Sequence, residues 1–441
     1  MSLEPALHLA VLTALAAPAA LLLVLGLGSL ALRPLPESSV ARMTRLSMAV
    51  CTLGLVTAIG LFVAGGLQRS MFVAHPWAAT GTQGLEFDLA LDGWSLSFAL
   101  LAAVITATVG AFSYRYLHRE RGFQRYFTLY ACFVLGIELV ALAGSMEVLL
   151  TGWELLGLSS ALLVAFFHER RAPVVNALRV FGIYRVSDAA MVAAAVLLHH
   201  SAGSSNLSAL LLAARPVSQA AAADAHFTTI ALFLVVAMAA KSALLPFAGW
   251  LPRAMEGPTP SSAVYYGALS VHAGCYLLWR AEPLLEQSVA ARVVAGALGL
   301  CTAVYATAVA RTQTDVKSSL SYATLTQVGI IVVEIALGLR VLAFVHLVGN
   351  ACLRLVQFLS APNVLQDLRG LEAPGQPRPE AQRRPTALWV FSLERGGIDG
   401  VLDRWFIAPF VALARWGTSL DRRLAGERAG DAAAPPTEVA R

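Results

Sequence analysis

The fold is decided by the stretch His226-Phe-Thr-Thr-Ile-Ala-Leu-Phe-Leu-Val-Val-Ala-Met-Ala-Ala-Lys241-Ser-Ala-Leu-Leu-Pro246-Phe-Ala-Gly-Trp-Leu-Pro252. It places an ammonium group near the middle of an apolar run that is long enough to span a bilayer. A charge at that depth costs about 3 kcal/mol on insertion scales, so it must be paired, hydrated or neutral. Pro246 breaks the helix, and broken helices at membrane depth usually line a cavity. The stretch predicts a broken helix over Lys241–Pro252 and an ion path at Lys241; the alternative is a lysine that reaches back to the membrane surface.

The composition around this stretch is that of a membrane protein. The chain is 57% hydrophobic and only 13% charged, with a mean hydropathy of +0.67. Soluble domains carry about 25% charged residues. Repeated apolar runs of roughly 20 residues predict an all-α polytopic membrane protein in contact with lipid. The net charge of +5 reflects basic loops and not a nucleic-acid surface. The five cysteines form no CxxC or Cys/His cluster, so we expect no metal site, cofactor or disulfide scaffold.

About eleven transmembrane helices are expected from these runs. The long basic loops, such as the one with Arg115, Arg119 and Arg121, all fall on one side if the N-terminus is outside. The positive-inside rule then predicts a multi-pass protein of the cell inner membrane with a cytoplasmic C-terminus. The expected spans are 6–32, 46–66, 93–113, 126–144, 148–167, 176–198, 227–251 (broken), 260–279, 290–310, 319–338 and 341–361.

The chain is expected to fall into five parts. Residues 1–92 hold the N-terminal helices, and 93–361 form a translocation core. Residues 362–395 are polar and rich in Pro, Arg and Gln, which predicts a cytoplasmic linker. Residues 396–425 resume helical periodicity with an apolar core too short to span, which predicts an amphipathic helix on the membrane surface or against a partner. Residues 426–441 are expected to be disordered.

Several further ionisable residues lie inside the expected spans. Glu154 would be protonated or paired, and either state suits proton relay. Arg185 and Asp188 lie three apart on one helical face. They can pair with each other only to lower the cost of insertion, or Asp188 can serve another helix. Glu138 and Glu334 are candidates either for function or for hydrogen bonds between helices.

Two histidines complete the candidate path. His272 can titrate near neutral pH and pass protons onward from Lys241, or it can be a packing residue that donates a hydrogen bond. The last span carries a polar stripe, because its polar residues recur at spacings of four, four and three. In lipid such a stripe must turn inward. Arginine stays charged, so the arginine in the stripe can anchor groups but is a poor proton carrier. The stripe consists of His346, Asn350, Arg354 and Gln357.

The segment Lys241-Ser-Ala-Leu-Leu-Pro-Phe-Ala-Gly-Trp-Leu-Pro-Arg-Ala-Met-Glu-Gly-Pro-Thr-Pro-Ser-Ser-Ala263 resembles the signature of the antiporter-like subunits of respiratory complex I and of Mrp cation/proton antiporters. Supporting stretches occur in the same order along the chain: Asp92-Gly-Trp-Ser95, Trp153-Glu154, Arg185-Val-Ser-Asp188 and Gln313-Thr-Asp-Val-Lys317-Ser-Ser-Leu-Ser-Tyr322. The resemblance implies an antiporter-like fold and ion translocation by a glutamate–lysine pair, Glu154 with Lys241. It implies Asp188 as the neighbouring carboxylate and Lys317 as the lysine of the second half, in a broken-helix region.

The chain also departs from that family pattern. Tyr266 stands where the family usually has a histidine, with His272 further along. Asn350 and Arg354 stand where it usually has a histidine and a lysine. The family continues beyond the last span found here, so the resemblance implies a truncated second repeat.

A second resemblance is narrower. The segment Leu393-Glu-Arg-Gly-Gly-Ile-Asp-Gly-Val-Leu-Asp-Arg404-Trp-Phe-Ile-Ala-Pro-Phe410 and the variant Pro258-Thr-Pro-Ser-Ser-Ala-Val-Tyr-Tyr-Gly-Ala-Leu-Ser-Val-His272 resemble the DabB family, the membrane subunits of DAB inorganic-carbon accumulation complexes. The resemblance implies a subunit that conducts H⁺ or Na⁺ and drives hydration of CO2 to bicarbonate on a DabA-type zinc partner, with no catalytic residue of its own. The alternatives are a subunit of an NADH-quinone oxidoreductase-like proton pump or of a multisubunit Na⁺/H⁺ antiporter, or a docking scaffold that moves no ions.

Overall fold

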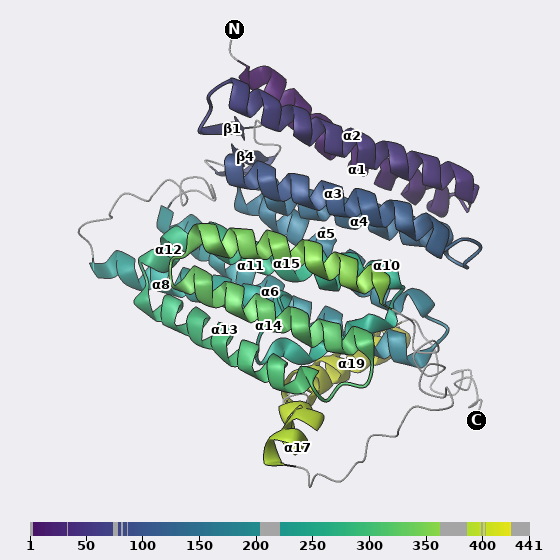
Figure 1. Ribbon diagram of the computed structural model, residues 1–441, viewed down its shortest axis with the longest axis vertical. Helices are drawn as coiled ribbons and strands as arrows, with labels where there is room; N and C mark the ends of the chain where they lie inside the picture. Colours follow the sequence, from purple (N-terminus) through teal and green to yellow (C-terminus); the bar gives the residue numbers. More distant parts are fainter. Residues whose placement is uncertain are drawn as a thin grey trace, which may run out of the picture.

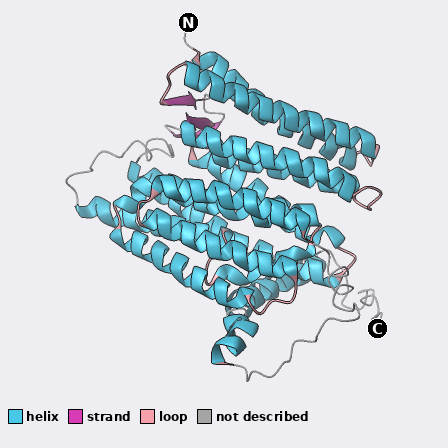
Figure 2. Ribbon diagram, viewed as in Figure 1, coloured by secondary structure: helices cyan, strands magenta, loops and turns pink. Residues whose placement is uncertain are grey.

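The computed structural model describes residues 3–32, 34–73, 78–80, 83–85, 87–202, 221–361, 386–397, 400–401 and 403–424. Most of the expected linker and all of the expected disordered tail lie outside these residues. The helices lie side by side in a stacked array that runs from the N-terminal pair to the last part of the core (Figure 1). Nearly all of the described chain is helical (Figure 2).

The N-terminal layer is a helical hairpin. α1 (Glu4–Leu30) packs along α2 (Glu37–Ala64), and a small antiparallel ribbon of β1 (Arg69–Val73) and β4 (Asp88–Asp92) follows. A second short ribbon pairs β2 (Ala78–Thr80) with β3 (Gln83–Leu85). These strands add a small non-helical cap to the expected all-α fold. Asp92 then caps the next helix, because its carboxylate accepts from the backbone N–H groups of Trp94 and Ser95.

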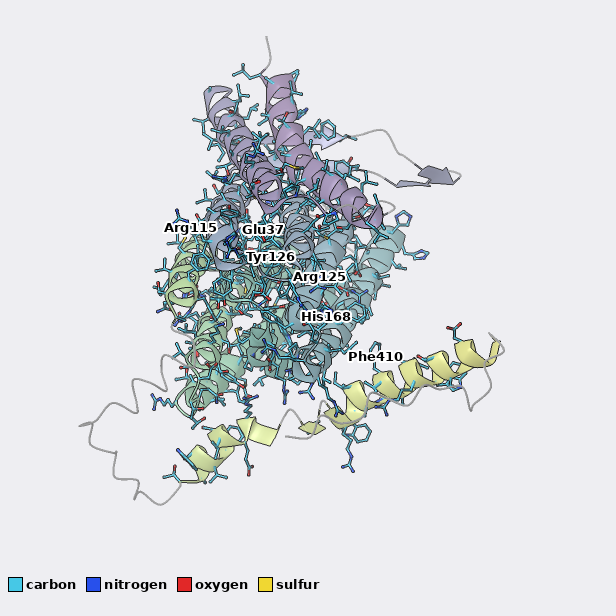
Figure 3. The ribbon with its side chains drawn as sticks, turned by 90° about the vertical axis from the view of Figure 1, so that its right-hand side faces the viewer. Glu37, Arg115, Arg125, Tyr126, His168 and Phe410 are labelled. Atoms are coloured by element: carbon cyan, nitrogen blue, oxygen red, sulfur yellow. The ribbon has the colours of Figure 1, made fainter. Side chains whose placement is uncertain are left out.

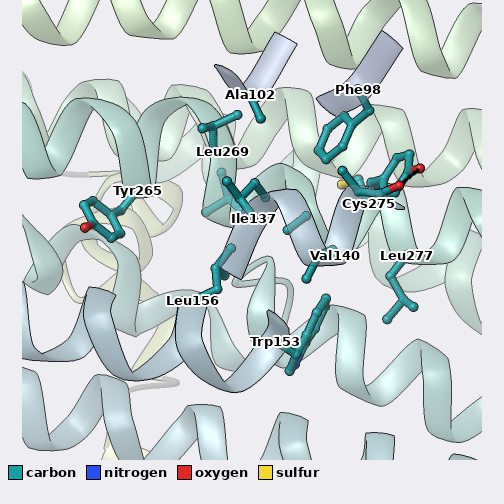
Figure 4. Close-up of a cluster of buried hydrophobic side chains, with 14 of the residues drawn as sticks. Phe98, Ala102, Ile137, Val140, Trp153, Leu156, Tyr265, Leu269, Cys275 and Leu277 are labelled. Atoms are coloured by element: carbon teal, nitrogen blue, oxygen red, sulfur yellow. Dashed lines mark hydrogen bonds between the residues drawn. The ribbon is translucent and has the colours of Figure 1, made fainter. Parts of the chain in front are cut away.

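The first half of the core contains α3 (Gly93–Tyr116), α4 (Phe123–Leu142), α5 (Met146–Val164) and α6 (Arg171–Ala202). Small residues allow α4 and α5 to approach closely: a Cβ added at Gly136 would lie 2.9 Å from the Gly152 carbonyl oxygen. Such small-residue contacts drive helix packing in membranes, where lipid supplies no hydrophobic force. Figure 4 shows Trp153 and Leu156 of α5 together with Ile137 and Val140 of α4 in the buried cluster.

The predicted helix break is present. α8 (Ala221–Lys241) ends at Lys241, and the chain continues through η2 (Phe247–Gly249), α9 (Trp250–Arg253) and η3 (Ala254–Glu256). α10 (Thr259–Ser261), η4 (Ser262–Leu269) and α11 (Ser270–Arg280) then form one helical stretch with a π-helical middle. The short α12 (Glu282–Glu286) leads into the second half of the core.

The second half of the core contains α13 (Val289–Ala310), α14 (Val316–Ala336) and α15 (Arg340–Ser360). Among the described residues, nine helices are long and apolar enough to cross a membrane. They coincide with nine of the expected spans. The other two expected spans correspond to α8 with the broken segment that follows it and to the stretch from α10 to α11. The chain is therefore a multi-pass, mainly helical membrane protein.

The C-terminal elements lie at the end of the bundle that carries Arg115 and His168, where Phe410 is also found (Figure 3). A short helix, α17 (Ala387–Leu393), occupies part of the segment expected to be linker, because Thr386 caps it. A wider turn, η6 (Asp403–Ile407), leads into α19 (Ala408–Leu424), whose first turn lies against α6 and whose later turns extend away from the stacked helices. Trp405, Leu413 and Trp416 of this segment are exposed. The domain limits themselves stay predictions.

Candidate ion-translocation site

The central group of charges is held together by Arg185 of α6. Its guanidinium binds Glu154 of α5 through two nitrogen–oxygen contacts of 2.7 and 3.3 Å. The Nη2 atom also lies 2.7 Å from Asp188 Oδ2, one turn further along α6. A planar guanidinium suits such a bridge because its donors form a fixed fork. Arg185, Glu154 and Asp188 therefore form one charge cluster.

Lys241 lies beside this cluster but does not bind it directly. Its side chain is fully buried, and Nζ donates to the Trp153 carbonyl oxygen at 3.1 Å. Nζ also lies 4.9 Å from the Trp153 ring and 4.4 Å from the Tyr184 ring, where cation–π attraction applies. Within the described residues no salt bridge joins Lys241 to a carboxylate. Full burial also excludes the alternative in which the lysine reaches the membrane surface.

The family resemblance implied a pair of Glu154 with Lys241, and among the described residues these two side chains form no salt bridge; their joint role in translocation stays a prediction. Glu154 binds Arg185 instead. The guanidinium of Arg185 contacts two carboxylates at once, while the ammonium of Lys241 lies against the rings of Trp153 and Tyr184. Gly157 makes this position possible: a Cβ there would lie 2.9 Å from Lys241 Nζ. The two groups still belong to one electrostatic cluster, because the charge of Lys241 interacts with those of Asp188, Glu154 and Arg185.

The break after Lys241 is stabilised by side-chain hydrogen bonds. Pro246 has no N–H, so the carbonyl four residues earlier loses its helical donor. Ser242 Oγ donates to the Val271 carbonyl oxygen at 2.6 Å, and the Leu245 N–H donates to Thr302 Oγ1 at 3.0 Å. Pro252 lies within the short α9 and begins no further break. These hydrogen bonds compensate for the backbone hydrogen bonds that are missing where α8 ends.

His272 lies on α11 and is fully buried. Its Nε2 atom is 2.9 Å from the Asn350 side-chain nitrogen of α15. Arg354 Nε donates to Asn350 Oδ1 at 3.3 Å, and its other nitrogens donate to Gln357 Oε1 and to the Ala323 carbonyl oxygen. The stripe on α15 thus turns inward at Asn350 and Arg354, as its spacing predicted.

The remaining residue of the stripe belongs to a separate group. His346 Nδ1 lies 3.0 Å from Glu334 Oε1 of α14, and its Nε2 lies 2.9 Å from Gln327 Oε1. The periodicity of α15 placed His346 and Arg354 on one face, but each has its own partners. Glu334 therefore serves as a partner between helices.

Lys317 lies in the first turn of the continuous helix α14, so the expectation of a broken helix there was wrong. Asp315 caps α14 by accepting from the Ser318 N–H, which allows regular helix from this point. Lys317 Nζ donates to Thr259 Oγ1 at 2.8 Å, and Tyr116 Oη lies 3.2 Å from the same oxygen. Thr259 lies at the start of the helical stretch that holds His272.

Buried polar groups lie beside Lys241 and on α11, the helix that also carries His272. The Tyr184 ring contacts Lys241, and the Tyr184 hydroxyl lies next to Ser270 of α11. The Tyr184 hydroxyl, the Ser270 hydroxyl and His272 Nδ1 are buried without a well-aligned hydrogen-bond partner within the described ranges of the chain. Buried polar groups of this kind are normally satisfied by water. The arrangement can therefore support proton transfer from the Lys241 side towards α15.

Sequence reasoning missed Tyr184 and Ser270. Tyr184 is one turn before Asp188 on the same face of α6, which could have drawn attention to it. Ser270 carries no such signal, because serine is ordinary in membrane helices. The transport roles of all these residues stay predictions.

Known proteins share this arrangement of helices. Residues 143–394 match the model of the family described as NADH:quinone oxidoreductase/Mrp antiporter, TM, and residues 77–127 match that of the complex I chain 5 N-terminus. NAD(P)H-quinone oxidoreductase subunit 5, organellar chromatophore 1, of Paulinella chromatophora is 30% identical over 66% of this chain and 44% of its own length. NADH-quinone oxidoreductase subunit L of Mycobacterium tuberculosis is 29% identical over 69% of this chain and 49% of its own length. The chain spans about half the length of these curated relatives.

Two solved structures have the same fold. The Mrp complex from Dietzia sp. DQ12-45-1b matches with a TM-score of 0.67 and 27% identity, over 80% of this chain and 37% of the matched chain. The membrane-bound sulfane sulfur reductase, an archaeal respiratory membrane complex, matches with a TM-score of 0.68 and 18% identity, over 79% and 70% of the two chains. The latter likeness concerns the fold alone. The family match extends over more than half of the sequence and includes the charge cluster and the helix break, so the chain belongs to the NADH:quinone oxidoreductase/Mrp antiporter transmembrane family.

Proposed function

We propose that this chain is an ion-translocating, energy-coupling subunit of a multisubunit membrane complex, and that the ion passes the cluster of Glu154, Arg185, Asp188 and Lys241. One observation carries the proposal: a fully buried lysine, without a salt bridge to any described residue, lies beside this cluster at a helix break. Lysine can release its proton when buried, whereas arginine cannot.

The balance of charges suits a transfer step. Arg185 and Lys241 carry two positive charges when protonated, and Glu154 and Asp188 carry two negative ones, so the cluster is neutral when all four are ionised. Arrival of a further proton makes the cluster positive and favours release from Lys241. The proton would leave through the polar groups at Tyr184 and Ser270 towards His272.

The exposed side of the cluster supports a role within a complex. The side chains of Glu154 and Arg185 are 42% and 35% exposed in the middle of their spans. Charged groups at membrane depth face protein or water rather than lipid. A neighbouring subunit that covers this side of α5 and α6 would shield the pair.

Reconstitution of the complex into liposomes tests the proposal. Lys241→Ala and Glu154→Gln should each lower the flux of H⁺ or Na⁺ by at least about a hundredfold, since each removes a group that transfers a proton. Glu286→Gln is the matched control, because Glu286 is exposed at the end of α12. If both cluster variants assemble and keep the full flux and the full coupled activity, the chain is a docking scaffold.

A second, finer candidate is the inorganic-carbon role. It is supported by the resemblance of residues 258–272 and 393–410 to the DabB family. The end of that second segment also contacts the translocation helix: Ile407 and Phe410 side chains approach Gly182 of α6, one turn before Arg185. Ion movement past Arg185 could thereby be transmitted to a DabA-type zinc partner at this end of the bundle, which would hydrate CO2 to bicarbonate.

Copurification separates this candidate from the alternatives. An inorganic-carbon complex predicts that a zinc-containing protein purifies with the chain and that cells lacking the gene require high CO2. Copurifying quinone-oxidoreductase subunits or other antiporter subunits, with normal growth in air, would favour the proton-pump or Na⁺/H⁺ antiporter role.

A further inference from the structure

Glu138 of α4 is a buried acid that the charge cluster does not use. Its side chain is 1% exposed, and neither carboxyl oxygen has a hydrogen-bond partner in the part of the chain that the structure describes. Such a group is unfavourable in either protonation state. An ionised carboxylate has a large desolvation penalty, and even a neutral carboxyl without partners loses the hydrogen bonds that it makes in water. Among the described residues, no hydrogen bond or ion pair of Glu138 accounts for it as a structural residue.

The opposing face of α2 is also polar. Thr44, Ser47 and Cys51 recur at spacings of three and four, so they lie on one side of the helix. All three are buried, and the hydroxyls of Thr44 and Ser47 have no hydrogen-bond partner among the residues that the structure describes. α2 packs against α4, and Cys51 lies near enough to Glu138 for an ionised carboxylate there to act on its thiol. The stripe therefore leads along α2 to the Glu138 carboxyl.

The same seam continues in hydroxyl groups of α3 and α4. Tyr130 donates to the Thr106 carbonyl oxygen, and Tyr126 Oη lies 2.9 Å from Ser113 Oγ. Gly110 lies between the Tyr130 ring and Thr44, since a Cβ there would be 3.5 Å from the ring and 3.8 Å from Thr44 Cγ2. Tyr126 lies at the end of the bundle that also carries Glu37 and Arg115 (Figure 3). We call the eight residues of this path the α2–α4 seam: Thr44, Ser47, Cys51, Thr106, Ser113, Tyr126, Tyr130 and Glu138.

The side chains of the seam suit the binding of a proton rather than of a metal cation. It offers one carboxyl with hydroxyl and thiol neighbours, whereas a metal cation takes several oxygen ligands. Carboxyl groups with hydroxyls and water are the usual components of proton relays in membranes. The seam is also separate from the charge cluster on α5, α6 and α8. Glu138 and all of α2 lie outside the residues that match the two family models.

We propose that Glu138 is a proton-binding site at the end of a second polar pathway, the α2–α4 seam, which exchanges protons with the side of the membrane that carries the α3–α4 loop. The proposal rests on the proposed function as an ion-translocating subunit and adds a second proton site to it.

Chemical labelling of the intact complex tests the site without any substitution. A hydrophobic carbodiimide reacts with protonated carboxyl groups inside membranes, and mass spectrometry of the peptides identifies the modified residue. Glu138 should be labelled, and the labelling should fall as the pH rises on the side of the α3–α4 loop. Absence of labelling, or labelling that is the same at every pH on that side, would overturn the proposal.

Flux measurements on the reconstituted complex test the pathway. Glu138→Gln keeps the size and hydrogen-bonding capacity of the neutral acid, and it should lower proton flux by at least about tenfold. The double variant Thr44→Val with Ser47→Ala should give a smaller loss in the same direction. Thr57→Val is the matched control, because Thr57 is exposed on α2 and bonds only its own helix.

The controls separate this inference from the proposed function. Wild-type flux in Glu138→Gln, together with strong losses in Glu154→Gln and Lys241→Ala, would refute the seam and leave the proposed function intact. Wild-type flux in all three variants would refute both.

Discussion

The substitution Gly157→Ala tests the position of Lys241 with the smallest possible change. A Cβ at residue 157 would lie 2.9 Å from Lys241 Nζ, and its next neighbour, a Tyr184 ring carbon, would be at 3.5 Å. Ordinary contact begins at about 3.5 Å, so only the ammonium must move, by about 0.6 Å. Its hydrogen bond to the Trp153 carbonyl oxygen is already 3.1 Å long. The shift would stretch that bond beyond the normal range.

The expected energies follow from this geometry. A hydrogen bond from a charged donor contributes about 1.5–3 kcal/mol. Alanine in place of glycine within a helix returns up to about 1 kcal/mol. The net loss of stability should therefore be about 1 kcal/mol, so the protein should still assemble. Misplacement of a reacting group by about 1 Å can slow a transfer step a hundredfold, and we expect a reduction in flux of roughly tenfold here.

The assay is ion flux in liposomes, together with the melting temperature in detergent. Gly349→Ala is the matched control, because a Cβ there meets nothing within 4 Å. A Gly157→Ala complex that assembles normally and translocates ions at the wild-type rate would contradict the placement of Lys241 on the ion path.

Two further predictions concern stability. Burial acts to raise the pKa of Asp92, but the Arg280 guanidinium 2.6 Å away overrides this effect and holds the pKa below its ordinary value of 3.8. The ion pair therefore stabilises the fold above pH 3.8, and its contribution is lost as the pH falls through the lower pKa of the folded state. The variant Asp92→Asn keeps the helix cap but should lower the free energy of unfolding by about 3 kcal/mol at neutral pH. Melting curves of this variant should lack the loss of stability in acid. Gly299→Ala would place a Cβ 2.6 Å from the Gly329 carbonyl oxygen and should destabilise the α13–α14 contact by about 1–3 kcal/mol. Gly296→Ala, whose Cβ would make only a 3.4 Å contact, should melt close to the wild type, and equal melting temperatures for the two glycine variants would contradict the close packing.

Hydropathy and helix-breaking residues determined the membrane part of this fold. The apolar runs predicted the spans, because a bilayer imposes the same length on every helix that crosses it. Pro246 predicted the end of α8, since it removes a backbone donor regardless of its surroundings. The sequence also predicted that the side chains of Asn350 and Arg354 point into the bundle, because polar groups on one helix face cannot point into lipid.

Only the tertiary structure decided which of these groups meet. Glu154 binds Arg185 and not Lys241, although the family resemblance pointed to the lysine. Partners depend on the rotation and depth of each helix, and these follow from close contacts such as Gly136 with Gly152 that no local pattern encodes. Hydropathy identifies which charged residues lie inside the membrane. The packing of helices that are distant in sequence decides the distances between these residues, and therefore which of them form ion pairs.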